Sequence, residues 1–353
     1  MSIPSQRQLF ASGYAPADQP GIHAFTLDGA TGALSPVGSF GGVANPSFIV
    51  IHPNGLWLYA VSEGGSGGSV WSARLDSMTL QLLNHQSSGG NGPCHLCFDT
   101  TGKWLFVANY GSGSAGVLPI QADGSLGEMT GHAQHYGSSG VNAARQEGPH
   151  AHSTTMTPDN RFAIVADLGL DKLMVYAFDE ERGTLNAHAE VATQPGAGPR
   201  HLAFHPNGQH VYVANELNST VAMYNYDAAN GALREAQVLS TLPDDAPENT
   251  VADIHIDEAG KRLYVSNRGH DSLAVFDVAQ DGRLTLVNIR PCGGAWPRNF
   301  ALAPGGKFVV VANQHNDGIA VLPLTSNDEA IGEPVAHGAA TQPSCVQFMP
   351  HTA

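Results

Sequence analysis

Hydrophobic and polar residues alternate along this chain in a pattern that recurs about every 50 residues. The clearest copy, residues 198–227, reads GPRHLAFHPNGQHVYVANELNSTVAMYNYD. Its first segment alternates and ends in a Pro-Asn-Gly turn, its second is rich in β-branched and aromatic residues, and its third runs toward an Asn-Gly turn at 230–231. A further apolar stretch, AQVLSTL, follows Leu233. The pattern predicts four short antiparallel strands per copy.

Six other segments match this unit. They span residues 45–63, 92–110, 149–179, 251–278, 296–324 and 342–350. When the copies are aligned on their turns, one position holds proline in five of them, namely Pro46, Pro93, Pro199, Pro297 and Pro343. Four antiparallel strands repeated in this way are typical of a propeller blade. The sequence therefore predicts an all-β fold, a seven-bladed β-propeller.

The last copy supplies only one strand before the sequence reaches Ala353. The N-terminal segments RQLFASGY, at 7–14, and GIHAFTLD, at 21–28, resemble the missing second and third strands. We therefore expect the last blade to be closed by N- and C-terminal strands, which leaves no free sheet edge. No change in pattern marks a domain boundary, so a single domain over residues 1–353 is predicted.

The amino-acid composition of the chain limits the classes of molecule that it can bind. The 353 residues contain 16 Lys and Arg against 31 Asp and Glu, a formal net charge of −15. Such a charge repels nucleic acids and anionic membranes, so we expect neither as a partner. An anionic small molecule would need a local cluster of positive charge. The oligomeric state is left open by the sequence.

The N-terminal segment MSIPSQRQLF lacks the basic and apolar regions of a signal peptide, and no stretch has the 18 apolar residues of a membrane helix. Four cysteines do not form a disulfide scaffold in a chain of this length. A cytoplasmic location is expected.

Propeller geometry brings particular strand ends together. The start of each blade's first strand, which lines the central channel, lies on the same face as the end of its antiparallel second strand. The start positions are Ser47, Cys94, His152, Arg200, Ala252, Arg298 and Ser344. The end positions are Glu63, Tyr110, Leu168, Glu216, Arg268 and Gln314. One mouth of the channel should therefore collect His152, Arg200, Glu216, Arg268 and Arg298, with His150 and His201 adjacent.

Three of the 16 basic residues, Arg200, Arg268 and Arg298, take these positions in an acidic chain. Their concentration favours an anion or oxyanion site. The alternative is that Arg200 or Arg298 only ties neighbouring blades together through one of three carboxylates, Asp167, Asp253 or Glu63.

Other candidate groups have structural explanations. His52 and His205 lie in repeat turns, where a packing role is expected. Cys94 and Cys97 are three residues apart in one predicted strand, so they should point to opposite faces, which makes them poor partners for one metal. They are interpreted as buried thiols.

Glycine runs at 64–68 and 111–116 follow predicted strands and are interpreted as loops, not phosphate-binding turns. No nucleophile-elbow GxSxG motif, in which the serine lies on a sharp turn from a strand into a helix, is evident, and this argues against a serine hydrolase triad. The longest irregular insert, residues 131–148, precedes the third blade and carries His132, His135 and Arg145.

Four segments are similar to motifs of a known family. They are RQEGPHAHS at 145–153, GAGPRHLAFHPN at 196–207, ANELNSTV at 214–221, and VADIHI with VSNRG within 251–269. They resemble the seven-bladed lactonase family, which includes the propeller-type 6-phosphogluconolactonases and, in fungi, the carboxy-cis,cis-muconate cyclases. The resemblance covers essentially the whole chain.

The resemblance implies an active site of four residues, His152, Arg200, Glu216 and Arg268. Strand geometry had independently placed these four at one mouth. Arg145 and His150 belong to the third-blade motif. They are candidate substrate-binding residues. Four further candidates lie at or next to the mouth positions, namely His201, Asn215, Asn267 and Arg298.

The resulting hypothesis is hydrolysis of a sugar-acid lactone, foremost 6-phospho-glucono-δ-lactone to 6-phosphogluconate, a step of the pentose phosphate pathway, without a cofactor or a metal. Ring opening needs a base for the attacking water and a stabilised oxyanion. Glu216 or His152 would be the base. Arg200 and Arg268 would hold the oxyanion and the acidic end of the substrate, with Arg298 as a further contact.

Three other functions stay open. A cyclase or lactonase could act on another organic-acid lactone, such as a muconolactone. A metal-dependent lactonase would hold a divalent ion through oxygen ligands drawn from Glu63, Asn109, Asp167 and Asn267. A non-enzymatic propeller would bind a protein partner at the same mouth, although converging His, Arg and Glu groups favour a small-molecule site.

Overall fold

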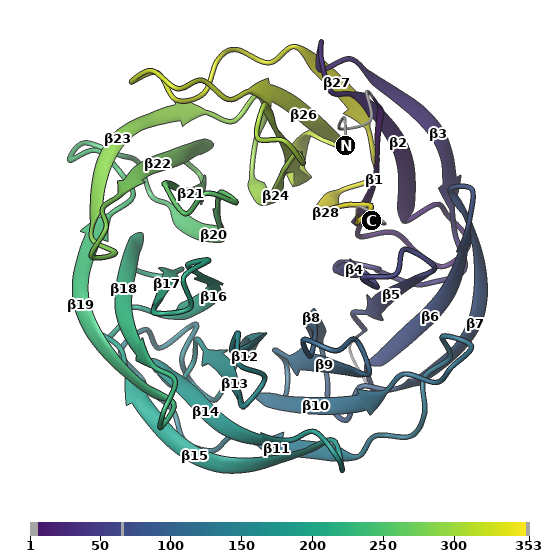
Figure 1. Cartoon of the computed structure of the whole chain (residues 1–353), viewed down its shortest axis with the longest axis vertical. Helices are drawn as coiled ribbons and strands as arrows, with labels where there is room; N and C mark the ends of the chain where they lie inside the picture. The colour runs from purple at the N-terminus through teal and green to yellow at the C-terminus, as the bar shows by residue number, and fades with distance from the viewer. Residues whose placement is uncertain (1–5, 65–66, 351–353) are drawn as a thin grey trace.

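The computed structural model of the chain arranges seven four-stranded sheets around a central axis (Figure 1). The structure describes residues 6–64 and 67–350. All strand pairs within the sheets are antiparallel, as for β16 and β17. The prediction of an all-β, seven-bladed propeller with four strands per blade is confirmed.

Blades 1 to 3 run in chain order from the innermost strand to the outermost (Figure 1). Blade 1 comprises β4 (Ile49–Ile51), β5 (Trp57–Ser62), β6 (Ser69–Asp76) and β7 (Thr79–Ser87). Blade 2 comprises β8 (Pro93–Phe98), β9 (Trp104–Asn109), β10 (Ser114–Pro119) and β11 (Gly131–Gln134). Blade 3 comprises β12 (Ala151–Met156), β13 (Phe162–Asp167), β14 (Lys172–Asp179) and β15 (Thr184–Ala192).

The next three blades repeat this order. Blade 4 comprises β16 (Pro199–Phe204), β17 (His210–Asn215), β18 (Thr220–Asp227) and β19 (Ala232–Ser240). Blade 5 comprises β20 (Thr250–Ile256), β21 (Arg262–Arg268), β22 (Ser272–Val278) and β23 (Leu284–Pro291). Blade 6 comprises β24 (Pro297–Leu302), β25 (Phe308–Asn313), the 3₁₀ helix η1 (Gln314–Asn316), β26 (Gly318–Pro323) and β27 (Ala336–Ala339).

Blade 7 joins the two ends of the described chain. It comprises β28 (Pro343–Phe348), β1 (Gln6–Gly13), β2 (Ile22–Asp28) and β3 (Leu34–Phe40), in that spatial order. In the register of β1 and β28, Phe10 lies opposite Gln347 and Ala11 opposite Val346. The predicted closure by N- and C-terminal strands is therefore confirmed, and backbone groups on both sides of β1 have partners.

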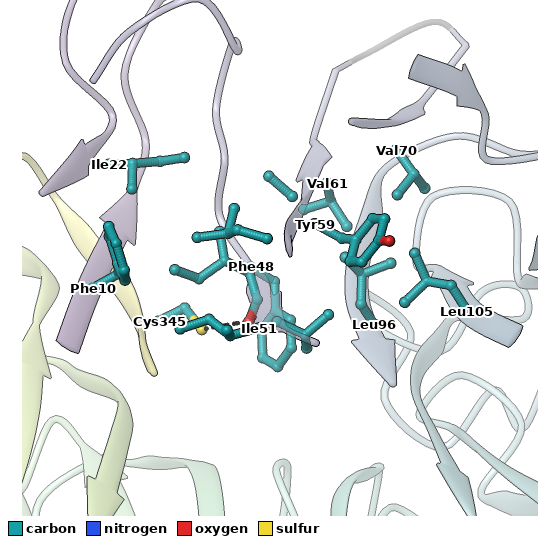
Figure 2. Packing of buried hydrophobic residues seen from close by; sticks show 14 of the residues in the cluster. Phe10, Ile22, Phe48, Ile51, Tyr59, Val61, Val70, Leu96, Leu105 and Cys345 are labelled. Carbon is teal, nitrogen blue, oxygen red and sulfur yellow. Dashed lines mark hydrogen bonds between the residues drawn. The ribbon is translucent and has the colours of Figure 1, made fainter. Parts of the chain in front are cut away.

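The core lies between neighbouring blades. Every residue of β17 and β25 is buried, because the inner strands of a blade pack on both faces against adjacent sheets. One cluster shows this packing, with Phe10 of blade 7, Ile51 of blade 1 and Leu96 of blade 2 in a single apolar group (Figure 2). Outermost strands such as β7 are largely exposed and polar. This rigid ring holds the ends of the inner strands in place.

The turn histidines connect neighbouring blades. Nε2 of His52 lies 2.9 Å from the carbonyl oxygen of Gly102, and Nε2 of His205 lies 3.0 Å from that of Gly260. A Cβ at Gly102 would come within 2.7 Å of the His52 ring, and its φ of +74° also favours glycine. The structural interpretation of these histidines is confirmed.

Two predicted loops differ in detail. Residues 131–134 of the predicted insert form β11, so the irregular connection to blade 3 begins only at His135. The glycine run 111–116 continues into β10, which begins at Ser114. Of the run 64–68, residues 65–66 lie outside the described residues, as do residues 1–5 of the segment from which the absence of a signal peptide was predicted.

Candidate active site

A β-bulge stands at the start of the innermost strand in most blades. The register between the first two strands shifts there, so that one residue of the inner strand has no partner. In blade 7 the same shift occurs between β28 and β1. A bulge of this kind turns a side chain out of the regular alternation. The unpaired residues are Cys94, His152, Arg200, Arg298 and Ser344.

These five bulge residues line one small cavity, which we call the axial pocket. Its other lining residues are Tyr14, Ser47, Phe48, Glu63 and His201. These five start positions of the repeat thus converge because each occupies the same bulge. Blade 5 differs, since its register shift leaves out both Ala252 and Asp253.

Glu216 is the centre of a cluster of arginines beside this pocket. It follows β17 directly, and its N–H donates to the carbonyl of Gly198 at 2.8 Å. Nη2 of Arg145 donates to its Oε1 at 2.6 Å. Its Oε2 lies 3.0 Å from Nε of Arg200 and 2.9 Å from Nη2 of Arg268. The structure therefore brings Arg200, Glu216 and Arg268 into direct contact, as strand geometry predicted.

Charges determine the protonation states of the cluster. Burial alone would raise the pKa of Glu216, but Arg268, Arg200 and Arg145 outweigh it and lower that pKa to about 2. Burial, with the nearby charge of Arg200, lowers the pKa of His152 well below 6.5. At neutral pH the cluster therefore holds a carboxylate and a neutral imidazole, whose Nε2 lies 4.0 Å from Oε2 of Glu216.

Arg298 belongs to a second group on the wall of the axial pocket. Its Nη2 donates to the hydroxyl of Tyr14 at 2.9 Å, and its guanidinium carbon lies 5.4 Å from the centre of the Tyr14 ring. The Tyr14 hydroxyl in turn donates to Oε2 of Glu63 at 2.8 Å. The sequence alternative of an arginine tied to Glu63 is thus realised indirectly, through Tyr14.

Tyr110 and His150 form the rim above His152. The rings of Tyr110 and His150 stack with centres 4.4 Å apart, and the Tyr110 ring meets that of His152 edge-on at 5.5 Å. Arg145 reaches over this rim, because its Nη2 also donates to the Tyr110 hydroxyl at 3.2 Å. Its neighbour Gln146 is fully buried, which anchors the loop that carries Arg145.

His201 lies below Arg200 and connects it to Asp253. Nδ1 of His201 lies 2.7 Å from Oδ1 of Asp253, and Nε2 lies 3.2 Å from Nη1 of Arg200. Burial and the charge of Arg200 lower the pKa of His201 to about 4, so its ring is neutral. A proton on Nδ1 then satisfies Asp253 and leaves Nε2 to accept from Arg200. Asp253 therefore positions Arg200 through His201.

An Asp253→Asn variant tests this connection. The amide no longer requires the proton on Nδ1, so His201 can present an N–H to the Arg200 guanidinium and displace it. We expect kcat/KM to fall on the order of tenfold to a hundredfold, with KM little changed. A His255→Gln variant, which changes only one of the three partners of the other Asp253 oxygen, should have a smaller effect. Equal activity of Asp253→Asn and wild type would contradict the positioning role.

Asn215 and Asn267 are not among the residues that line the pocket. The Asn215 amide donates to Thr220 at 2.9 Å, and the Asn267 amide donates to Ser272 at 3.2 Å. Asn109 makes the equivalent bond to Ser114. Each amide therefore ties the second strand of its blade to the third. Their proposed contact with substrate has no support in this geometry.

Of the oxygen ligands considered for a divalent ion, both carboxylate oxygens of Asp167 have partners in the fold. Asp167 accepts from the backbone N–H of His150 at 2.8 Å and lies 2.5 Å from Nδ1 of His135. Within residues 6–64 and 67–350, no three His, Cys, Asp or Glu side chains form a group able to hold a metal ion.

Both cysteines of β8 face blade 3, so the prediction of opposite faces was wrong. Sγ of Cys94 lies 3.3 Å from the carbonyl oxygen of His152, and Sγ of Cys97 lies 3.2 Å from Oγ1 of Thr154. The bulge at Cys94 adds a residue and reverses the alternation that separates them. Burial raises the pKa of each thiol to about 12, which agrees with the interpretation as inert thiols.

Comparison with known protein families shows to which family this chain belongs. The family described as "Lactonase, 7-bladed beta-propeller" matches residues 8–348. The chain belongs to this family. Among its relatives is a 6-phosphogluconolactonase of Bacillus subtilis (strain 168), 35% identical over 340 residues that cover 95% of this chain and 96% of the relative. A 6-phosphogluconolactonase of Formosa agariphila is 33% identical over 311 residues, 85% of this chain and 87% of the relative.

Solved structures of the lactonase family superimpose over the whole propeller. A periplasmic gluconolactonase of Pseudomonas aeruginosa, PpgL, has a TM-score of 0.92 at 33% identity and covers 98% of this chain and 99% of its own. A putative 6-phosphogluconolactonase of Bacteroides fragilis has a TM-score of 0.90 at 30% identity, with 98% of each chain covered. The chain is thus a lactone-hydrolysing enzyme. None of the helices in the described part of this lactonase has the length and apolar character needed to span a membrane.

Tyr14, a polar residue of this lactonase pocket, was missed in the sequence. Tyr14 takes the end position of blade 7, and aligning RQLFASGY with WLFVANY would have placed it in the same slot as Tyr110. Asp253 follows the start position Ala252 in the one blade with a two-residue shift. The sequence alternative of Arg200 tied to Asp253 is realised indirectly, through His201.

Proposed function

We propose that the axial pocket hydrolyses the lactone of a phosphorylated sugar acid, with 6-phospho-glucono-δ-lactone as the preferred substrate and 6-phosphogluconate as the product. The observation that carries the proposal is the set of four arginines, Arg145, Arg200, Arg268 and Arg298, around the neutral imidazole of His152. This local excess of positive charge in a chain of net charge −15 suits an anionic substrate. The names of the Bacillus and Formosa relatives support the phosphorylated form.

His152 is the better of the two candidate bases. Glu216 has a pKa of about 2 and is held by three arginines, so it accepts a proton poorly. Neutral His152 can take a proton from water as that water attacks the lactone carbonyl carbon. The imidazolium that forms lies 4.0 Å from the Glu216 carboxylate, which stabilises it.

Arg200 and Arg268 would stabilise the oxyanion. Each is held by a second bond, because Nη1 of Arg200 donates to the carbonyl of Ala252 at 2.6 Å and Nη2 of Arg268 donates to that of Val251 at 2.8 Å. Donors fixed in this way need no rearrangement as charge develops. The tetrahedral intermediate then collapses, the bond from the carbonyl carbon to the ring oxygen breaks, and the ring oxygen takes the proton from His152.

Hydrolysis of freshly generated 6-phosphogluconolactone, measured above its spontaneous rate, tests the proposal. We expect Arg200→Ala to lower kcat by about 10² to 10³-fold, the usual cost of one oxyanion donor. Arg182→Ala is the matched control, since that side chain is 72% exposed and pairs only with Asp179. Wild-type rates in folded Arg200→Ala would remove this site assignment. Muconolactone in the same assay tests the organic-acid alternative, and added chelator tests a requirement for a metal.

Arg145 is placed to contact the phosphate. Its side chain is 36% exposed at the rim, so the far end of a substrate whose carbonyl lies at His152 would reach it. Replacing Arg145 with Met should lower kcat/KM for the phosphorylated lactone about tenfold more than for glucono-δ-lactone, because a charge-assisted hydrogen bond is lost. Equal losses on the two substrates, measured side by side, would contradict a role in phosphate recognition.

A further inference from the structure

Glu63 places a second carboxylate on the wall of the axial pocket. It follows β5, and its N–H donates to the carbonyl of Asn45 at 3.1 Å while the Asn45 amide donates to its own carbonyl at 3.2 Å. Oε2 accepts hydrogen bonds from the Tyr14 hydroxyl and from Oγ of Ser47. Oε1 accepts none from the described residues. One oxygen is therefore held by the fold and the other is left for a ligand.

The neighbouring groups fix the direction of these hydrogen bonds. Burial raises the pKa of Tyr14, so its hydroxyl stays protonated. Because Arg298 can only donate, the Tyr14 oxygen accepts from it at 2.9 Å and its hydrogen points to Glu63. Ser47, which is 4% exposed, has a fixed position because its carbonyl accepts from the hydroxyl of Ser344 at 2.7 Å. The Glu63 carboxylate is thus held by buried neighbours.

The charges around Glu63 restrict what it can bind. An ionised carboxylate only accepts hydrogen bonds, so an anionic group of a ligand has nothing to donate to it. A cationic group would be repelled by Arg298 and Arg200, which line the same pocket. The ligand group that satisfies both conditions is a neutral donor, a hydroxyl. A sugar acid combines an acidic group for the arginines with several hydroxyls.

We propose that Glu63, held by Tyr14 and Ser47, is a hydroxyl-binding subsite through which the axial pocket selects lactones of polyhydroxy acids. This inference rests on the proposed function and deepens it. A site built to accept a hydrogen bond from a substrate hydroxyl discriminates strongly against analogues that lack it, because its own polar group is then left unpaired. The pocket should therefore reject lactones of the same ring size that carry no hydroxyls.

Binding of D-gluconate and hexanoate, measured by calorimetry, tests the subsite without turnover. The two ligands share six carbons and one carboxylate and differ in their hydroxyls. Wild type should bind gluconate at least about tenfold more tightly than hexanoate. Glu63→Gln should weaken gluconate binding about tenfold and leave hexanoate within about twofold, because only the charged acceptor of a hydroxyl has been removed. Tyr14→Phe removes one of the two hydrogen bonds that hold Oε2 of Glu63. This variant should weaken gluconate binding less than Glu63→Gln does and should leave hexanoate binding unchanged.

The control is Glu190→Gln, an exposed carboxylate on β15 that pairs with Lys172, and it should bind both ligands as wild type does. If Glu63→Gln weakens the binding of both ligands equally, Glu63 only maintains the structure of the pocket. If it weakens the binding of neither ligand, Glu63 is not part of the site. Wild type binding hexanoate as tightly as gluconate overturns the proposal even if a variant fails to fold. Absence of lactone hydrolysis, measured separately, would instead overturn the proposed function.

Discussion

A Glu216→Gln variant is expected to lose about 3–5 kcal/mol of its free energy of unfolding and most of its lactonase activity. The substitution keeps the shape of the side chain but removes the one carboxylate that, among the described residues, contacts Arg145, Arg200 and Arg268. Of these, Arg200 and Arg268 have side chains only 3% and 6% exposed, so water cannot replace the lost partner. Activity falls because the two guanidinium groups assigned to the oxyanion repel each other and move apart.

The same substitution should also change how the free energy of unfolding depends on pH. The pKa of Glu216 is about 2 in the folded protein against 4.5 for an unperturbed glutamate. A lowered pKa contributes stability that is complete above about pH 4.5 and is lost as the pH falls toward 2, a component of roughly 3 kcal/mol. Wild type should therefore lose stability on acidification over this window, and Glu216→Gln should lack that component.

Urea unfolding at pH 7 and at several values between 5 and 2.5, followed by circular dichroism, measures both effects. Glu235→Gln is a suitable control, because this carboxylate lies on the outer strand β19 and contacts only the hydroxyl of Tyr224. Unchanged stability of Glu216→Gln at pH 7 would show that the arginines do not depend on this carboxylate.

A His152→Asn variant is expected to lower kcat by about 10² to 10⁴-fold, the usual contribution of a general base, with little loss of stability. His152 is neutral, and among the described residues its ion-pair contact with Glu216 is long, at 4.0 Å. Removing it therefore leaves no buried charge without a partner. The oxyanion donors stay in place, so a residual rate above the spontaneous background should remain.

Initial rates on the phosphorylated lactone, with thermal unfolding of the same samples, separate the chemical from the structural effect. His188→Asn is the control, because His188 is an exposed residue of β15 that bonds only to a blade 4 turn. A loss of less than about threefold in His152→Asn would assign the base to another group, with Glu216 as the remaining candidate.

Much of the candidate site could be read from the repeat. Cys94, His152, Arg200 and Arg298 occupy equivalent repeat positions, so a fold that repeats its backbone had to bring them to one mouth. A neighbour in sequence is not always a neighbour in the pocket, since His201 lines the axial pocket and Asn215 does not. Asn215 precedes Glu216, but successive residues of a strand point to opposite sides, and its amide bonds within blade 4.

The amino-acid sequence by itself determined the number of blades, the closure by both chain ends and the face on which His152, Arg200, Glu216 and Arg268 meet, because these depend on periodicity and strand direction. Only the tertiary structure decided that Glu216 is a fixed, ionised partner of three arginines and that Tyr14, Glu63 and Asp253 belong to the same machinery. Protonation and pairing depend on burial and on distances between different blades. Those distances are set by packing around the axis and by bulges of one residue, which the repeat pattern does not encode.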